Sequence, residues 1–179
     1  MKKKNRIIFI LLTAVFMMVS GCGNKGDKDN SDTFQELSEE DLAPDFTAET
    51  VDGKTIVLAE QKGKVVLLNF WATWCGPCVG EMPAFEKLYS EYGEKIVILA
   101  VDCAEDKDTV KQFVSDNGYT FPVAYDTEGS ISAKYPTSGI PYTLIIGKDG
   151  KVKETYLGAD DADAQYMEYK KAIDAVLGE

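Results

Sequence analysis

The stretch FWATWCGPCVGEMP, from Phe70 to Pro83, contains two cysteines, Cys75 and Cys78, that are separated by two residues. The cysteines follow a β-rich apolar run, Lys64 to Trp71, and precede apolar residues at helical spacing. This pattern predicts a buried strand, a tight turn and a helix, with Cys75 at the strand-to-helix junction. The two cysteines could form half of a metal site, a structural disulfide or a reactive dithiol.

The cysteine count and the composition bear on this choice. The chain has four cysteines and no histidine. A zinc site would need a second C-x-x-C pair or histidines, so we expect no metal ion and no other cofactor. A disulfide across two intervening residues removes little chain entropy, and a domain of this size does not need such a staple. The reactive dithiol is the interpretation that remains.

The predicted junction favours a reactive thiol at Cys75. Unpaired N–H groups and the helix dipole at a helix N-terminus stabilise an anion, and a thiolate is an anion. In C-x-x-C motifs at such positions the thiol pKa falls to about 3.5–7.5, from about 8.5 in a free cysteine. Gly76 and Pro77 suit the first turn. The N–H groups of a first turn have no partner within the helix, so a proline, which lacks an N–H, is tolerated there. We therefore predict that Cys75 is the nucleophile and that Cys78, one turn later, is the resolving thiol.

The remaining apolar patterns predict one α/β domain. A chain of 179 residues fits a single domain with its own core. The expected strands after Trp71 are Ile96–Val101, Phe121–Ala124, Thr143–Ile146 and Lys151–Leu157; the expected helices follow the cysteines, surround Val110–Val114, cover Ile131–Tyr135 and surround Tyr166–Leu177. Strands alternating with helices, then a hairpin and a last helix, predict a central mixed sheet with helices on both faces.

The N-terminus has the pattern of an export signal. The basic residues MKKKNR precede an apolar run, Ile7–Val19, which is shorter than the about 20 residues that a membrane span needs. VSGC, ending at Cys22, resembles the lipobox of bacterial lipoproteins, in which the cysteine receives a diacylglyceryl group. We predict a signal peptide at 1–21, a lipidated Cys22 with a polar tether at 22–41, and a domain at 42–179. An ordinary secretory signal and an uncleaved anchor are the alternatives.

Three motifs carry a resemblance to a known family. WCGPC, Trp74–Cys78, resembles the active-site segment of the thioredoxin superfamily, and GIPYTLIIGKDGKV, Gly139–Val152, resembles its cis-proline loop and the hairpin after it. LAPDF, Leu42–Phe46, resembles the opening of the redoxin and TlpA-like branch, and Asp108–Pro136 matches the helix and strand that this branch inserts. From about Leu42 to the C-terminus the chain is similar to membrane-anchored ResA/TlpA-type thiol-disulfide oxidoreductases.

The resemblance implies a thioredoxin-like fold with a TlpA-type N-terminal extension and a central αβ insertion. It implies that Cys75 and Cys78 form a redox disulfide, that Trp74 shields the thiol, and that the Ile140 backbone beside cis-Pro141 pairs with a partner's extended chain. The implied partners are exported proteins with disulfides, such as apocytochrome c, and a membrane thiol electron donor at the outer face of the cell membrane. Nucleic acid is not expected, because the net charge is −11.

One departure from the family concerns the proton that Cys78 must lose. Thioredoxins carry a buried Asp where this chain has Asn69, which cannot ionise. In ResA-like proteins an active-site Glu follows the strand predicted here at Ile96–Val101, and Glu105 aligns best with it. We therefore expect Glu105 to accept the proton. Glu105 could instead be a solvated loop acid or a neighbour of a helix N-cap ahead of Thr109.

Other departures leave two functional alternatives open. Tyr142 follows Pro141 where Thr is common, and Cys103 is an additional cysteine that we interpret as a small buried residue rather than a regulatory thiol. A lipoprotein peroxiredoxin is one alternative, since APDF also opens that branch, but a peroxidatic cysteine needs T-x-x-C and Thr73 is only two residues before Cys75. The other is a non-catalytic binding lipoprotein that uses the same scaffold.

Overall fold

The computed structural model describes residues 37–178, which contain a five-stranded sheet and a two-stranded hairpin. The strands are β1 (Thr47–Glu49), β2 (Thr55–Val57), β3 (Val65–Trp71), β4 (Ile96–Cys103), β5 (Val123–Asp126), β6 (Tyr142–Ile146) and β7 (Val152–Leu157). The helices are α1 (Gly76–Tyr92), α2 (Lys107–Asn117) and α3 (Ala162–Leu177), with short 3-10 helices η1 (Leu58–Gln61), η2 (Gly93–Lys95) and η3 (Ser132–Lys134). Cys22 and the predicted signal peptide lie outside the described residues.

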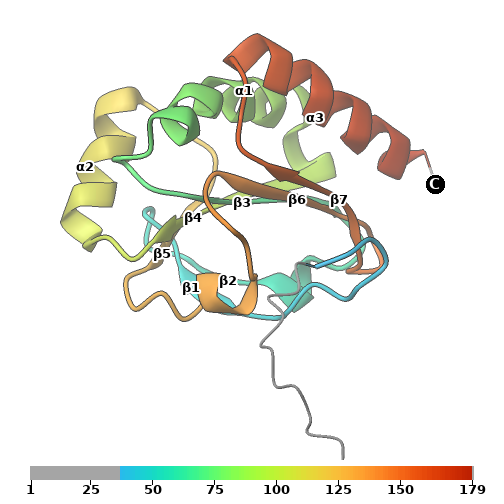
Figure 1. Cartoon of the computed structure of the whole chain (residues 1–179), viewed down its shortest axis with the longest axis horizontal. Coiled ribbons are helices and arrows are strands. Elements are labelled where there is room, and N and C mark those ends of the chain that lie inside the picture. Colours follow the sequence, from blue (N-terminus) through green and yellow to red (C-terminus); the bar gives the residue numbers. More distant parts are fainter. Residues whose placement is uncertain (1–36, 179) are drawn as a thin grey trace, which may run out of the picture. The chain divides into compact units, whose positions relative to one another are not determined.

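The five-stranded sheet is mixed, as the sequence predicts. Its strand order is β5-β4-β3-β6-β7. Strands β3, β4 and β5 are parallel, whereas β6 is antiparallel to β3 and β7 is antiparallel to β6 (Figure 1). All seven residues of β3 are buried, because the central strand is covered on both faces. The prediction of a thioredoxin-like α/β fold around a mixed sheet is confirmed.

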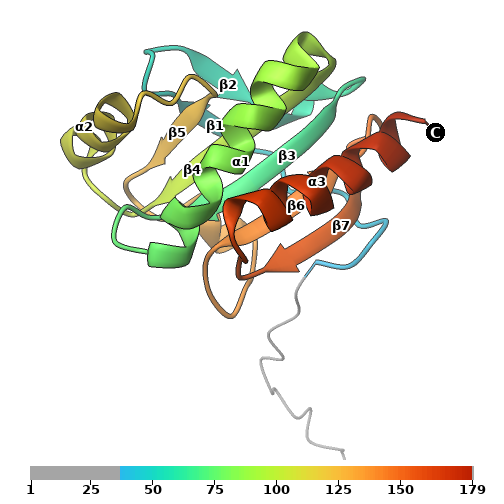
Figure 2. The ribbon, with the colours of Figure 1, turned by 90° about the horizontal axis from the view of Figure 1, so that it is seen from above.

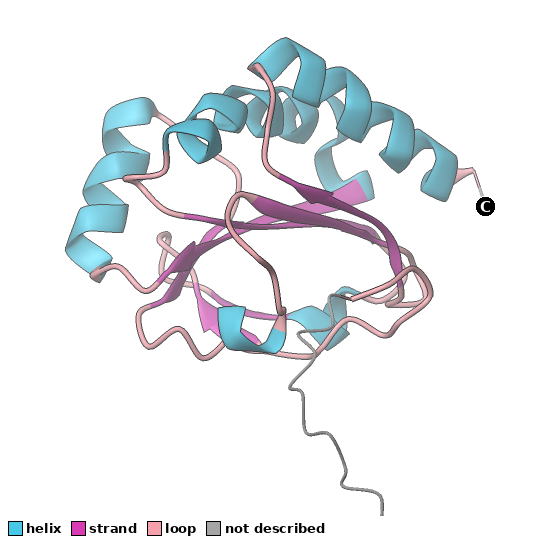
Figure 3. Cartoon of the chain, in the orientation of Figure 1, coloured by secondary structure: helices cyan, strands magenta, loops and turns pink. Residues whose placement is uncertain are grey.

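The two faces of the sheet are covered differently. Helices α1, α2 and α3 lie on one face and share a hydrophobic core with it (Figures 1 and 2). The other face carries the β1–β2 hairpin and the 3-10 helices η1 and η3, whose apolar residues form a second core (Figure 3). Helices flank the sheet as predicted, but within residues 37–178 the three α-helices lie on one face and only 3-10 helices lie on the other. No helix within residues 37–178 is long and apolar enough to cross a bilayer.

Several element boundaries differ from the predicted ones, and three differences have a clear physical reason. Strand β5 begins at Val123 rather than Phe121, since Pro122 has no N–H to donate to the ladder. The expected helix at Ile131–Tyr135 is only a 3-10 turn, whose first N–H groups donate to the buried carboxylate of Asp126. The β1–β2 hairpin was not predicted, because strands of three residues are too short to show a clear alternation of apolar and polar residues.

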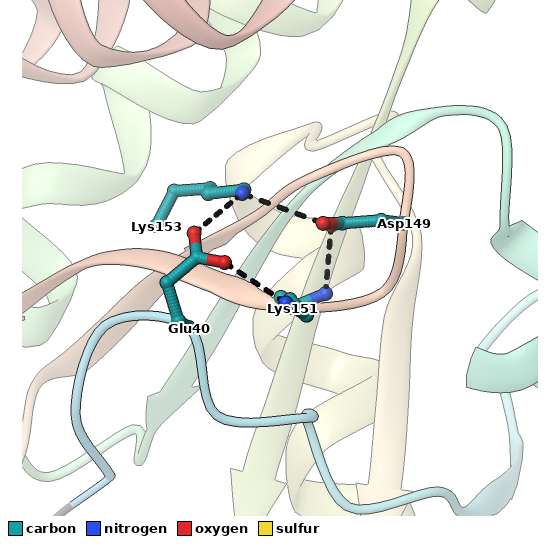
Figure 4. A network of polar contacts seen from close by, with 4 residues as sticks. All are labelled: Glu40, Asp149, Lys151 and Lys153. Atoms are coloured by element: carbon teal, nitrogen blue, oxygen red, sulfur yellow. Dashed lines mark hydrogen bonds and ion pairs between the residues drawn. The ribbon is translucent and has the colours of Figure 1, made fainter.

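The chain enters the folded region at the hairpin between β6 and β7. The N–H of Glu40 donates to the Val152 carbonyl and the N–H of Val152 donates to the Asp41 carbonyl, each at 2.8 Å. The Glu40 carboxylate also forms ion pairs with Lys151 at 3.0 Å and Lys153 at 2.7 Å (Figure 4). These residues, which the sequence assigns to the tether, are therefore bonded to the sheet. The attachment lies at the end of β6 opposite to Tyr142, away from the predicted active site.

Candidate active site

The two cysteines lie where β3 ends and α1 begins, and they form a disulfide with an S–S distance of 2.03 Å. Cys75 is the N-cap of α1, and the N–H of Cys78 donates to its sulfur at 3.3 Å. A donor aimed at the Cys75 sulfur stabilises negative charge there once the disulfide is reduced. Cys75 is 6% exposed and Cys78 is 0% exposed, so Cys75 is the sulfur that a partner can reach.

The predicted cis-proline loop faces the disulfide. The Ile140–Pro141 peptide bond is cis, and the Ile140 carbonyl oxygen lies 3.8 Å from the Cys75 sulfur. Trp74 is 72% exposed beside the disulfide, whereas Trp71 is fully buried and packs against Phe113. The structure therefore brings Cys75 and Ile140 together and leaves the Trp74 ring free on the surface. The roles of Trp74, Ile140 and Pro141 in holding a partner remain predictions.

A buried acid that sequence reasoning missed lies on α1 behind the disulfide. Glu81 is 0% exposed and follows Cys78 by three residues, which places both side chains on the same face of the helix. Its carboxyl accepts hydrogen bonds from Asn69 Nδ2 at 2.9 Å and from the Tyr169 hydroxyl at 2.7 Å. Burial raises the pKa of Glu81 from 4.5 to about 7, against the opposing effect of the hydrogen bonds from Tyr169 and Asn69.

A signal for Glu81 exists in the sequence. Helical spacing from Cys78 and Phe85 puts position 81 on the apolar stripe, and a Glu within such a stripe is either paired or functional. Asn69 of β3 lies against the same part of α1, since its side-chain amide donates directly to Glu81. The acid that the chain lacks at position 69 is thus supplied from the helix.

Glu105, the acid that the sequence singled out, is half-buried just after β4. Its two carboxylate oxygens accept from the Thr73 N–H and the Thr73 hydroxyl, both at 2.6 Å. Burial acts to raise the pKa of Glu105, but hydrogen bonds with Asp102 and Thr73 outweigh it, so the pKa lies below its ordinary value. The pKa of Asp102 is raised to about 8, mainly by burial and secondly by the hydrogen bond with the neighbouring Glu105. Glu105 is therefore an ionised group that binds the loop two residues before Cys75.

The free cysteine of the described residues, Cys103, lies close to the same edge of the sheet. Cys103 is half-buried at the end of β4. The pKa of its thiol is raised to about 12, mainly by burial and secondly by the negative charges of the nearby Asp102 and Asp126. A thiol that stays protonated is a poor nucleophile, so Cys103 does not compete with Cys75 for a partner. Within residues 37–178 no group of three or more His, Cys, Asp or Glu is arranged to hold a metal ion.

An accessible sulfur at a helix N-terminus, a buried second sulfur and a facing cis-proline loop define a thiol-disulfide oxidoreductase of the thioredoxin-like class. Comparison with known proteins leads to the same class. The sequence profile of the AhpC/TSA family matches residues 40–155. The thiol-disulfide oxidoreductase ResA of Bacillus thuringiensis (strain Al Hakam) is 38% identical over 179 residues, which cover 96% of this chain and 98% of that protein.

Solved structures agree with this assignment. A thiol:disulfide interchange protein of the thioredoxin family from Chlorobium tepidum TLS matches with a TM-score of 0.69 and 26% identity, over 79% of this chain and 99% of that one. The pneumococcal exposed lipoprotein thioredoxin Etrx1 from Streptococcus pneumoniae strain TIGR4 matches with a TM-score of 0.63 and 31% identity, over 72% of this chain and 99% of that one. This chain therefore belongs to the AhpC/TSA family and, within it, to the ResA-like thiol-disulfide oxidoreductases.

Proposed function

We propose that this oxidoreductase is a lipoprotein on the outer face of the cell membrane, where it reduces disulfides in exported proteins. The sequence VSGC, ending at Cys22, supports the lipid anchor. The attachment of Glu40 at the end of the sheet opposite to the disulfide is compatible with such an anchor, because it leaves the active-site edge open to partners. Apocytochrome c and oxidised surface proteins are the proposed substrates, and a membrane thiol carrier is the proposed electron donor.

In the proposed reaction the reduced Cys75 thiolate attacks a partner disulfide. A bond forms between the Cys75 sulfur and one partner sulfur, and the other partner sulfur leaves as a thiolate. Cys78 then loses its proton and attacks the Cys75 sulfur, which releases the second partner thiolate and closes the Cys75–Cys78 disulfide. The partner gains two electrons and the enzyme loses two. The observation that carries this assignment is the unequal exposure of the two cysteines, 6% for Cys75 against 0% for Cys78.

Resolution requires an acceptor for the Cys78 proton, and two carboxyls are candidates. Glu105 is the sequence-based candidate, and its hydrogen bonds join it to Thr73 and Asp102 rather than to either sulfur. Glu81 lies one helical turn from Cys78, and its pKa of about 7 suits a base that works near neutral pH. We propose that Glu81 accepts the proton and that Glu105 acts on the reaction through the loop before Cys75.

Replacing Glu105 with Gln tests this division of roles. A Gln at this position can still accept from the Thr73 N–H, so the variant removes the charge with little loss of structure. We expect the pH dependence of Cys78 resolution to keep its midpoint, while the apparent pKa of reduced Cys75 falls because a nearby negative charge is lost. Single-turnover kinetics with a coloured aromatic disulfide measure both steps. A midpoint that moves in Glu105→Gln would return the acceptor role to Glu105.

Replacing Cys22 with Ser tests the anchor. The variant should carry no lipid, although an uncut precursor can stay in the membrane through its apolar run at residues 7–19. Mass spectrometry of the wild-type protein from membranes should show a diacylglyceryl group on Cys22. An unmodified Cys22 in that fraction would refute the lipoprotein proposal.

The peroxiredoxin alternative and the direction of electron flow are decided by two assays on the wild-type protein. As a disulfide reductase, the reduced protein should reduce protein disulfides rapidly and react with hydrogen peroxide no faster than an ordinary thiol of similar pKa. Rapid consumption of peroxide would favour the peroxiredoxin alternative instead. Equilibration against glutathione or dithiothreitol buffers measures the reduction potential, and a potential near that of thioredoxin, about −270 mV, would agree with a reductant.

A further inference from the structure

The hydroxyl of Tyr169 lies between two partners in the buried region behind the disulfide. It is 2.7 Å from Glu81 Oε2 and 3.2 Å from Thr143 Oγ1. Asn69 Nδ2 completes the group, since it lies 2.9 Å from Glu81 Oε1 and 2.9 Å from Thr143 Oγ1. All four side chains are at most 1% exposed and come from α1, β3, β6 and α3. The Glu81 carboxyl is thus held by a closed ring of hydrogen bonds.

The Tyr169 ring is fixed in place by its neighbours. It stacks on Phe85 of α1, with ring centroids 5.8 Å apart, and meets the Tyr156 ring of β7 edge to face at 5.1 Å. A side chain locked by packing on two sides holds its hydroxyl at a defined point, as a positioning group must. The last helix of the fold, α3, therefore supplies one of the two donors that hold the Glu81 carboxyl, and Asn69 of β3 supplies the other.

A tyrosine hydroxyl can serve both protonation states of Glu81. It has one hydrogen to donate and lone pairs that accept. When Glu81 is ionised, the hydroxyl donates to Oε2. When Glu81 takes the proton released by Cys78, its new O–H can donate to the Tyr169 oxygen, while the tyrosine hydrogen turns to Thr143 Oγ1. The proton from Cys78 is the only charge that the ring of hydrogen bonds gains in this step.

We propose that Tyr169 is a positioning residue for thiol-disulfide exchange: it holds the Glu81 carboxyl behind Cys78 and sets the pH at which the buried thiol can be deprotonated. This inference rests on the proposed role of Glu81 as the proton acceptor. Removing the hydroxyl removes a donor from the ionised carboxylate, so the pKa of Glu81 should rise further above its ordinary value. Removing Thr143 Oγ1 instead removes the acceptor that the tyrosine hydrogen needs when Glu81 is protonated, so the pKa should fall.

Few other groups act on this carboxyl. The titratable and polar side chains in contact with Glu81 or its partners are Asn69 on β3, Thr143 on β6, Tyr156 on β7, and Tyr169 and Gln165 on α3. Cys78 lies one turn earlier on α1, on the same face as Glu81. Within residues 37–178 no lysine or arginine contributes to the pKa of Glu81. A change in its titration in Tyr169→Phe can therefore be assigned to the lost hydroxyl.

The test is the pH dependence of Cys78 resolution, followed by stopped flow with the coloured aromatic disulfide. In Tyr169→Phe we expect the midpoint to rise by about one pH unit, so that resolution on the acid side is about tenfold slower while the alkaline plateau is kept. Thr143→Val should move the midpoint the other way, and it keeps the inference testable if Tyr169→Phe does not fold. The matched control is Tyr166→Phe, which removes a tyrosine–glutamate hydrogen bond from the surface of the same helix and should leave the midpoint in place.

The outcomes separate this inference from the role of Glu81. If Glu81→Gln abolishes the pH step but Tyr169→Phe leaves the midpoint unchanged, the role of Tyr169 is refuted and that of Glu81 stands. If Glu81→Gln leaves the pH step intact, both proposals fail. In the Glu81→Gln background Tyr169→Phe should add no further pH effect, because the two residues act on one proton. An independent effect there would also overturn the proposal.

Discussion

The Cys75→Ser variant is expected to lose disulfide reductase activity down to the uncatalysed background. Cys75 supplies the thiolate that attacks, and Cys78, at 0% exposure, cannot replace it as a nucleophile toward a protein partner. Activity should be measured with the reduced protein and a protein disulfide as substrate. Residual turnover close to that of the wild type would mean that Cys78 or Cys103 can start the reaction.

The Cys78→Ser variant should behave in a different way. Attack by Cys75 survives but resolution does not, so covalent mixed disulfides with partners should accumulate and disappear on treatment with a reductant. Cys103→Ser is the matched control, because burial and two neighbouring acids keep that thiol protonated. It should retain wild-type activity and trap nothing. Partners found on Cys103 in the Cys78→Ser variant would contradict the inert role assigned to that residue.

The second large effect is expected from Glu81→Gln and concerns stability. Burial raises the pKa of Glu81 from 4.5 to about 7 in the folded protein, whereas an unfolded chain keeps the ordinary value. The proton-bound form is therefore favoured by folding, and its contribution to stability is complete below about pH 4.5. As the pH rises through about 7 this contribution is lost, because the unfolded chain ionises more easily. The difference corresponds to about 3 kcal/mol, at 1.36 kcal/mol for each pKa unit.

Glu81→Gln cannot ionise, so it should lack this part of the pH dependence. Between pH 4 and pH 8 the free energy of unfolding of the oxidised wild type should fall by about 3 kcal/mol more than that of the variant. Urea denaturation at both pH values measures this difference, and Glu94→Gln, at an exposed position of η2, is a suitable control for the loss of one carboxylate. Equal pH dependence in wild type and variant would show that Glu81 is ionised at its ordinary pKa.

The same variant should resolve mixed disulfides slowly at every pH. A variant that is more stable at alkaline pH and slower in exchange would identify Glu81 as a residue kept for function at a cost in stability. Slower exchange without the stability difference would instead indicate that the carboxyl acts only through the local structure of α1.

The strand, the junction and the helix around the dithiol follow from local patterns in the sequence. The run before Trp71 and the spacing after Cys78 predict the strand, the junction and the helix, because period and turn chemistry are properties of neighbouring residues. The C-x-x-C motif at that junction predicts a reactive dithiol for the same reason. The cis-proline at Pro141 was expected from a family resemblance, and the structure places it opposite Cys75.

The distribution of acids around the dithiol, in contrast, depends on long-range packing. The sequence indicated that Asn69 leaves the Cys78 proton without its usual acceptor, and it pointed to Glu105 because that residue follows the correct strand. The fold directs Glu105 to Thr73 and brings Glu81 against Asn69 and Tyr169, a residue 88 positions further along the chain. Burial and long-range hydrogen bonds set the pKa of a carboxyl, and both arise only when helices and strands distant in sequence pack together.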